Sequence, residues 1–151
     1  MVKVLCPKCP NCGAPISTDS ERCEYCASPV IITSFSSALE SFSRAIDGGV
    51  MNSEVFFWAG VCCLGGKKAF LAKREVIDKA EEYINAARML EDRGIYAYFG
   101  AYVRYDYFKR KSLIARPDYR ELLSEAKRLG VSEGDIRVLY GVLGVERPKE
   151  L

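Results

Sequence analysis

The sequence predicts a mainly α-helical protein in which a small cysteine-rich module precedes an antiparallel array of about six helices. Five of the seven cysteines fall within the first 26 residues. From Thr33 onward, apolar residues recur at the spacing of amphipathic helices. Two kinds of marker residue also recur with a period of about 40 to 41 residues. We therefore expect two domains, the cysteine module at residues 1–33 and the helical domain at residues 34–151.

Composition excludes several classes of protein. The chain has 151 residues, of which 49% are hydrophobic and 28% are charged, as in ordinary globular proteins. Its net charge of +2 lacks the excess of a protein that wraps nucleic acid. The longest apolar run, residues 55–64, is about half of the ~20 residues that a membrane span needs. Residues 1–5 lack the features of a signal peptide. We therefore expect a cytoplasmic protein with no membrane contact.

The cysteine module contains two C-x-x-C elements separated by ten residues, Cys9-Pro-Asn-Cys12 and Cys23-Glu-Tyr-Cys26. A gap of two residues lets both sulfurs reach one ion at about 2.3 Å, and two such turns complete a tetrahedron. The chain contains no histidine, so the ligands must be thiolates. We predict one structural Zn²⁺ held by Cys9, Cys12, Cys23 and Cys26. Four protein ligands leave no open coordination position, so the site is not catalytic.

A competing first element is Cys6-Pro-Lys-Cys9. The residue after the second cysteine of such a turn often needs a positive φ, which glycine adopts freely and proline cannot. Gly13 follows Cys12, whereas Pro10 follows Cys9, so we assign Cys9 and Cys12 and leave Cys6 as a spare thiol. The odd number of cysteines disfavours a disulfide framework.

In residue order, CPNCGAPI followed by CEYCASPVI resembles the zinc-ribbon family over about residues 1–33. The resemblance implies a small β-hairpin module with a recognition role. The resemblance does not indicate which function the module has, because zinc ribbons occur in transcription, translation, RNA-binding and adaptor proteins. Ala27 stands where the family usually has glycine.

Helix ends can be read from capping residues and glycines. The first helix should begin at a capping box formed by Ser37 and Glu40 and end at residues 48–49. The second should open near residues 52–53 and end at residues 65–66. The third carries an apolar face from residue 76 to residue 90 and should end at Gly94.

The fourth helix should span about residues 95–111. Pro117 fits the first turn of the fifth helix, which precedes Gly130. Ser132 and Asp135 can cap the sixth helix.

Two markers repeat along these helices. A bulky residue followed three positions later by alanine recurs with separations of 41 and 40 residues, at Phe42, Tyr83 and Leu123. A glycine recurs with separations of 40 and 41 residues, at Gly60, Gly100 and Gly141. Because glycine lets two backbones approach, the pattern predicts close packing of antiparallel helix pairs.

The segment Ala38-x-x-x-Phe42-x-x-Ala45 resembles the second-helix signature of the tetratricopeptide family, and the likeness extends over residues 36–144. The period of 40 to 41 residues exceeds the family's standard of about 34. We therefore expect a tetratricopeptide-like array of lengthened helix pairs.

Two features suggest a surface for a partner. The fourth helix holds five of the nine tyrosines, and Tyr98, Tyr102 and Tyr105 form one stripe that is either core packing or a binding groove. Residues 64–79 carry a net charge of +3 and residues 95–116 a net charge of +4. Both segments contain equivalent connections of the array, so we expect their cations at one edge, either as a recognition surface or as a solvated face. We call this set the basic edge: Lys67, Lys68, Lys73, Arg74, Lys109, Arg110 and Lys111.

These observations favour a non-enzymatic adaptor that binds a protein partner through its helical array and ribbon. The alternative is an RNA- or ribosome-associated factor that uses the ribbon and the basic edge. The sequence has no phosphate-binding loop, nucleophile elbow or open metal site, so we expect no enzyme. Asp106 should pair with an arginine in the core, and Cys62 and Cys63 should be buried as small apolar residues.

Overall fold

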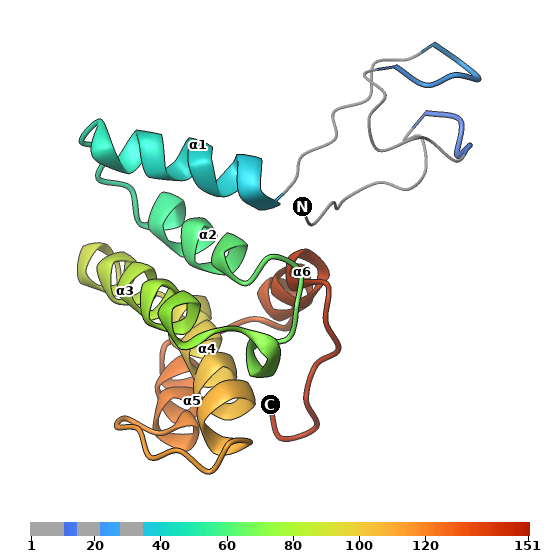
Figure 1. Ribbon diagram of the computed structural model, residues 1–151. Coiled ribbons are helices and arrows are strands. Elements are labelled where there is room, and N and C mark those ends of the chain that lie inside the picture. The colour runs from blue at the N-terminus through green and yellow to red at the C-terminus, as the bar shows by residue number, and fades with distance from the viewer. Residues whose placement is uncertain (1–10, 15–21, 28–34) are drawn as a thin grey trace.

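The structure is a computed structural model that describes residues 11–14, 22–27 and 35–151 (Figure 1). Within these ranges the chain forms six α-helices and two short helical turns, which confirms the mainly helical fold. The elements are α1 (Phe35–Asp47), α2 (Ser53–Cys63), η1 (Ala69–Leu71), α3 (Arg74–Leu90), α4 (Gly94–Val103), η2 (Arg104–Lys109), α5 (Tyr119–Arg128) and α6 (Glu133–Leu143). The hairpin expected of the cysteine module falls largely on residues outside the described ranges, and so does the predicted domain boundary.

Side chains cap three of the helices. Asn52 caps α2 by accepting a hydrogen bond from the Glu54 amide at 2.9 Å, and Ser132 caps α6 by accepting one from the Asp135 amide at 3.0 Å. Both starts were expected from the sequence. Asp118 forms a capping box with Glu121 at the start of α5, so Pro117 precedes that helix instead of entering it.

Two predicted helix ends are wrong. α1 begins at Phe35, so Ser37 lies within the helix, where its carbonyl accepts a hydrogen bond from the Ser41 hydroxyl. α3 ends at Leu90 because Glu91 is extended, with φ −154° and ψ 124°. Gly94 does not stop α3 but is the first residue of α4. Its lack of a side chain serves packing, since an added Cβ would lie 2.8 Å from the Val131 amide nitrogen.

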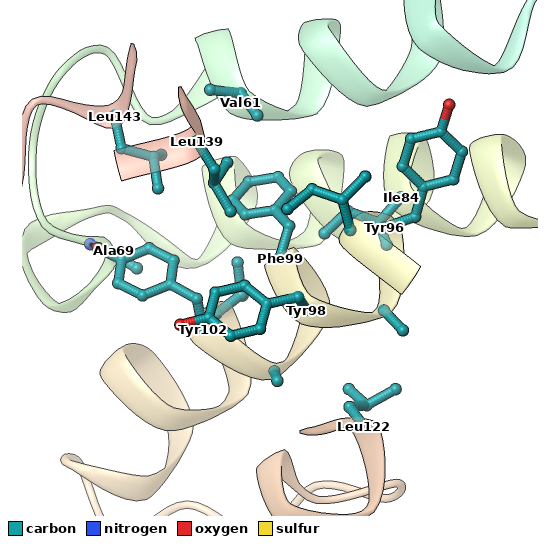
Figure 2. Close-up of a cluster of buried hydrophobic side chains, with 14 of the residues drawn as sticks. Val61, Ala69, Ile84, Tyr96, Tyr98, Phe99, Tyr102, Leu122, Leu139 and Leu143 are labelled. Atoms are coloured by element: carbon teal, nitrogen blue, oxygen red, sulfur yellow. Dashed lines mark hydrogen bonds between the residues drawn. The ribbon is translucent and has the colours of Figure 1, made fainter. Parts of the chain in front are cut away.

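The hydrophobic core is centred on α4, all ten of whose residues are buried. α3, α5 and α6 all contact this helix, and α2 packs between α1 and α3 (Figure 1). Figure 2 shows Val61 of α2, Ile84 of α3, Leu122 of α5 and Leu139 of α6 converging around Phe99 and its neighbours on α4. A helix enclosed in this way must be apolar on every side, as its sequence is.

The glycine markers lie at helix contacts in two cases. A Cβ added at Gly60 would lie 3.3 Å from Cβ of Tyr83, and one added at Gly100 would lie 3.4 Å from Cδ1 of Leu122. The equivalent helix pairs are therefore α2 with α3 and α4 with α5. A Cβ at Gly141 would meet nothing within 4 Å. The likeness of the whole array to tetratricopeptide repeats stays a prediction.

No helix in the part of the chain that the structure describes combines the length and the apolar character needed to cross a bilayer.

Residues 34–151, expressed without the ribbon, should fold as an almost wholly helical domain. The large core cluster draws its buried side chains from Phe57 to Leu151 and none from the described residues 11–14 and 22–27. Circular dichroism should show a single cooperative loss of helical signal on heating. A fragment that is unfolded, or rich in strand, would contradict the view that the helices form their own core.

Candidate metal centre and basic edge

Three cysteines of the predicted zinc site lie together. The Sγ atoms of Cys12, Cys23 and Cys26 are all within 4.8 Å of one another, and those of Cys12 and Cys23 are 3.6 Å apart. A tetrahedral zinc ion with Zn–S bonds of about 2.3 Å separates two ligand sulfurs by about 3.8 Å. The three sulfurs therefore fit one zinc ion. Cys9, the fourth predicted ligand, lies outside the described residues, as does Cys6.

The backbone around these cysteines adopts the turns that a thiolate site needs. Gly13 has φ +73° and Ala27 has φ +57°, and each follows the second cysteine of its element. The positive φ expected after Cys12 is thus confirmed. The Tyr25 amide donates to Sγ of Cys23 at 3.4 Å, which stabilises negative charge on that sulfur. Ala27 shows that this conformation is reached even where a Cβ makes it less favourable.

The second cysteine pair is chemically different. Burial raises the pKa of both Cys62 and Cys63 to about 11, so both side chains are neutral thiols at physiological pH. A neutral thiol is a poor metal ligand. Among the described residues, the cluster of three or more metal-binding side chains is the one at Cys12, Cys23 and Cys26. The expectation that Cys62 and Cys63 behave as core residues is confirmed for the buried Cys62, and Cys63 is half-buried.

The proposed tyrosine groove is wrong for two of its three residues. The side chains of Tyr98 and Tyr102 are each 1% exposed, and Tyr105 is half-buried. The Tyr98 hydroxyl lies 3.2 Å from that of Tyr140, and the Tyr102 hydroxyl accepts a hydrogen bond from the Ala69 amide at 3.2 Å. Burial raises the pKa of Tyr102 to about 12. Because α3, α5, α6 and η1 enclose α4, these tyrosines belong to the core.

The two cationic segments do come together, as expected from the array. Asp106 in η2 is 3% exposed and accepts hydrogen bonds at 2.8 Å from the Phe70 amide and from Nη1 of Arg110. The predicted pairing of Asp106 with an arginine is therefore confirmed. Together with the bond from the Ala69 amide to Tyr102 of α4, these contacts hold the turn at residues 67–74 against α4 and η2.

The seven cations of the basic edge are exposed. Several of them cover aromatic rings. The Arg110 guanidinium lies 4.3 Å from the centroid of the Phe70 ring, Nζ of Lys111 lies 4.2 Å from that of Tyr107, and the Arg74 guanidinium lies 5.1 Å from that of Phe108. Such contacts hold the cations against the surface and occupy one face of each ring.

Sequence reasoning missed a set of aliphatic side chains near these cations. Leu71 is 67% exposed, Leu113 is 42% exposed and Ile114 is 93% exposed. Leu113 and Ile114 lie in the connection between η2 and α5, outside any amphipathic helix. The sequence did carry a signal of their exposure, because these two aliphatic residues are adjacent in a segment without helical periodicity.

Comparison with protein families gives a match for the cysteine module. Residues 8–30 match the zinc-ribbon domain family. The match includes all four predicted zinc ligands and leaves Cys6 outside. Comparisons with curated proteins and with solved structures each gave no match. The chain therefore carries a zinc-ribbon domain at residues 8–30, followed by the helices α1 to α6.

Proposed function

We propose that this protein is a non-enzymatic adaptor that binds a protein partner through the basic edge, with the zinc ribbon as a second contact surface. A zinc ion held by four thiolates has no position for a substrate, so the ribbon's metal serves its folding. Zinc-ribbon domains are found in proteins that bind nucleic acids or other proteins. The surface of the helical domain is what distinguishes a protein partner from a nucleic-acid partner.

The observation that carries the proposal is the way the basic edge is built. Two segments more than thirty residues apart are joined by a buried carboxylate, Asp106, which binds the amide of one and the guanidinium of the other. The cations around this joint are exposed, and three of them, Arg74, Arg110 and Lys111, lie over aromatic rings. A set of like charges gathered at one edge promotes association with a surface of opposite charge and gives it specificity.

Two observations favour a protein over RNA as the partner. Sequence-tolerant binding of single-stranded RNA relies on bases stacking against open aromatic rings. At this edge the rings of Phe70, Tyr107 and Phe108 are covered by the edge's own cations. The Leu113 and Ile114 side chains are exposed and line the same hollow as Lys109, and exposed apolar side chains gathered beside charges are typical of protein contacts.

Reversing three charges of the basic edge should abolish capture of the partner. The edge variant carries Lys67→Glu, Lys68→Glu and Lys109→Glu, and it keeps Arg110 because that residue pairs with the buried Asp106. Each exposed charge change should cost no more than about 0.5 kcal/mol of stability. The measurement is recovery of bound protein from lysate on the immobilised full chain, with helix content checked by circular dichroism.

A matched control has the same change in net charge away from this edge, with Lys127→Glu, Arg128→Glu and Arg137→Glu. It should capture the same protein as the unmodified chain. Treatment with ribonuclease should not change the result, and raising the salt from about 50 to about 200 mM should not abolish binding as it does for phosphate contacts. If the edge variant and the control both capture the partner fully, the basic edge is a solvated face and the proposal fails.

A further inference from the structure

A cavity of about 180 Å³ lies beside the basic edge, between η2, the connection that follows it and the start of α5. We call it the α5 cavity. Its volume is below the ~300 Å³ of sites that enclose a small-molecule ligand, so it suits a single side chain. The side chains that decide its chemistry are Arg104, Lys109, Ile114, Arg116, Asp118 and Arg120.

The α5 cavity carries an excess of positive charge. Four cations line it, Arg104, Lys109, Arg116 and Arg120, against one carboxylate, that of Asp118. That carboxylate already accepts hydrogen bonds from the Arg120 and Glu121 amides at 2.9 and 3.0 Å, and these bonds lower its pKa. Arg104 also pairs with Glu81 at 2.7 Å, and Arg116 pairs with Glu121 at 3.7 Å. Within the described part of the chain, Lys109 and Arg120 are then the lining cations that form no salt bridge with a carboxylate. A cavity with this balance attracts an anionic group.

The same cavity has an apolar wall. Ile114 is 93% exposed, more than any other large hydrophobic side chain in the described part of the chain, and Leu113 is 42% exposed. Both line the cavity together with Phe108, which is 5% exposed. A phosphate group would contact the cations and leave these aliphatic side chains in water. A ligand that fits both parts carries an anionic group next to an apolar one.

We infer that the α5 cavity receives an acidic segment of the partner protein in which a carboxylate side chain stands beside an aliphatic one. This inference rests on the proposed function and specifies the chemistry of its partner. The carboxylate contacts the cations that line the cavity, and the aliphatic side chain covers Ile114 and Leu113. The complementarity of charge therefore extends the contact from the basic edge to the start of α5.

The test uses fluorescence anisotropy of labelled probes with the full-length chain. The probes are a short peptide of alternating glutamate and leucine, a peptide of equal length with serine in place of leucine, a lysine–leucine peptide, and an oligouridine RNA. The glutamate–leucine peptide should bind about tenfold more tightly than the glutamate–serine peptide, since leucine is removed from water only in the first complex. The lysine–leucine peptide and the RNA should bind more weakly than both.

Two substitutions test the apolar and the cationic side chains of the α5 cavity separately. Ile114→Ser should weaken binding of the glutamate–leucine peptide about tenfold and leave the glutamate–serine peptide unchanged. Arg120→Glu should weaken both acidic peptides. The matched controls are Val138→Ser, at a residue that is 56% exposed on α6, and Arg137→Glu, and neither should alter binding.

The inference is overturned if the two acidic peptides bind alike and Ile114→Ser changes neither, or if the RNA binds most tightly. Its failure is distinct from that of the proposed function. If Ile114→Ser and Arg120→Glu leave peptide binding intact while the edge variant loses capture of its partner, the cavity inference is wrong and the proposed function stands. If the edge variant keeps full capture, the proposed function is wrong, whatever the peptides do.

Discussion

Replacing Cys23 with serine is expected to release the zinc ion and unfold the ribbon while the helices keep their structure. Cys23 is 2% exposed, and its sulfur lies 3.6 Å from that of Cys12, so it stands within the predicted ligand set. A structural zinc site contributes on the order of 10 kcal/mol to folding of its module, and a serine hydroxyl does not replace a thiolate. Elemental analysis should find one equivalent of zinc in the unmodified chain and none in this variant.

Cys6→Ser serves as the control and should retain one equivalent of zinc. Helix content, measured by circular dichroism, should be the same in both variants because the core cluster contains no residue of the ribbon's described part. Loss of zinc from Cys6→Ser would move the fourth ligand from Cys9 to Cys6. Retention of zinc by Cys23→Ser would contradict the four-thiolate site itself.

Gly94→Ala is expected to destabilise the helical domain by about 3 kcal/mol or more. An added Cβ would lie 2.8 Å from the Val131 amide nitrogen and 2.9 Å from the Ala126 carbonyl oxygen. These are backbone atoms, which cannot rotate away, so α4 and the end of α5 would have to separate. The midpoint of urea-induced unfolding should fall accordingly.

Gly141→Ala is the matched control, since it places the same methyl group on another helix. Nothing lies within 4 Å of a Cβ at this position, and alanine favours helix over glycine by about 0.5–1 kcal/mol. This variant should be as stable as the unmodified chain or slightly more stable. Equal unfolding midpoints for the two variants would show that α4 and α5 do not pack as closely as the structure has them.

The cysteine module was the part of the molecule most accessible to sequence reasoning. Metal ligands obey local rules, because a two-residue gap and a positive φ are properties of a few adjacent residues. Gly13 therefore identified the turn after Cys12, and the structure shows the expected φ. Six helices were also predicted for the part that the structure describes, and the starts of α2 and α6 were predicted because Asn52 and Ser132 cap them through neighbouring amides.

The tyrosines show where the sequence could not decide. A helix that is apolar on all sides is either enclosed or lines a groove, and the choice depends on where the other helices lie. Tyr98 and Tyr102 fit both interpretations until α6 and η1 are placed against them. Gly94 presents the same difficulty, because a glycine between two helices looks like a stop signal whether its role is conformational or, as here, to allow close contact with Val131.

The basic edge was predicted in position but not in construction. The equivalence of two connections in consecutive repeats suggested that their cations would meet, and Asp106 joins the two segments. The change of α4 into the π-helical turn η2 was not predicted, because such a turn depends on tertiary packing more than on residue type. The exposed position of Ile114 was also missed, because its lack of helical periodicity is a signal of a connection, and only the finished fold shows that no helix covers it.

The most direct test of the central claim is lysine footprinting of the unmodified chain, alone and in complex with the protein that it captures. An amine-reactive acylating reagent reports which lysine side chains the partner covers, without any substitution. We predict that Lys67, Lys68 and Lys109 become protected in the complex, while Lys127 on α5 reacts at the same rate in both states. If the three lysines of the basic edge react as fast in the complex as in the free chain, the partner binds elsewhere and the account is wrong.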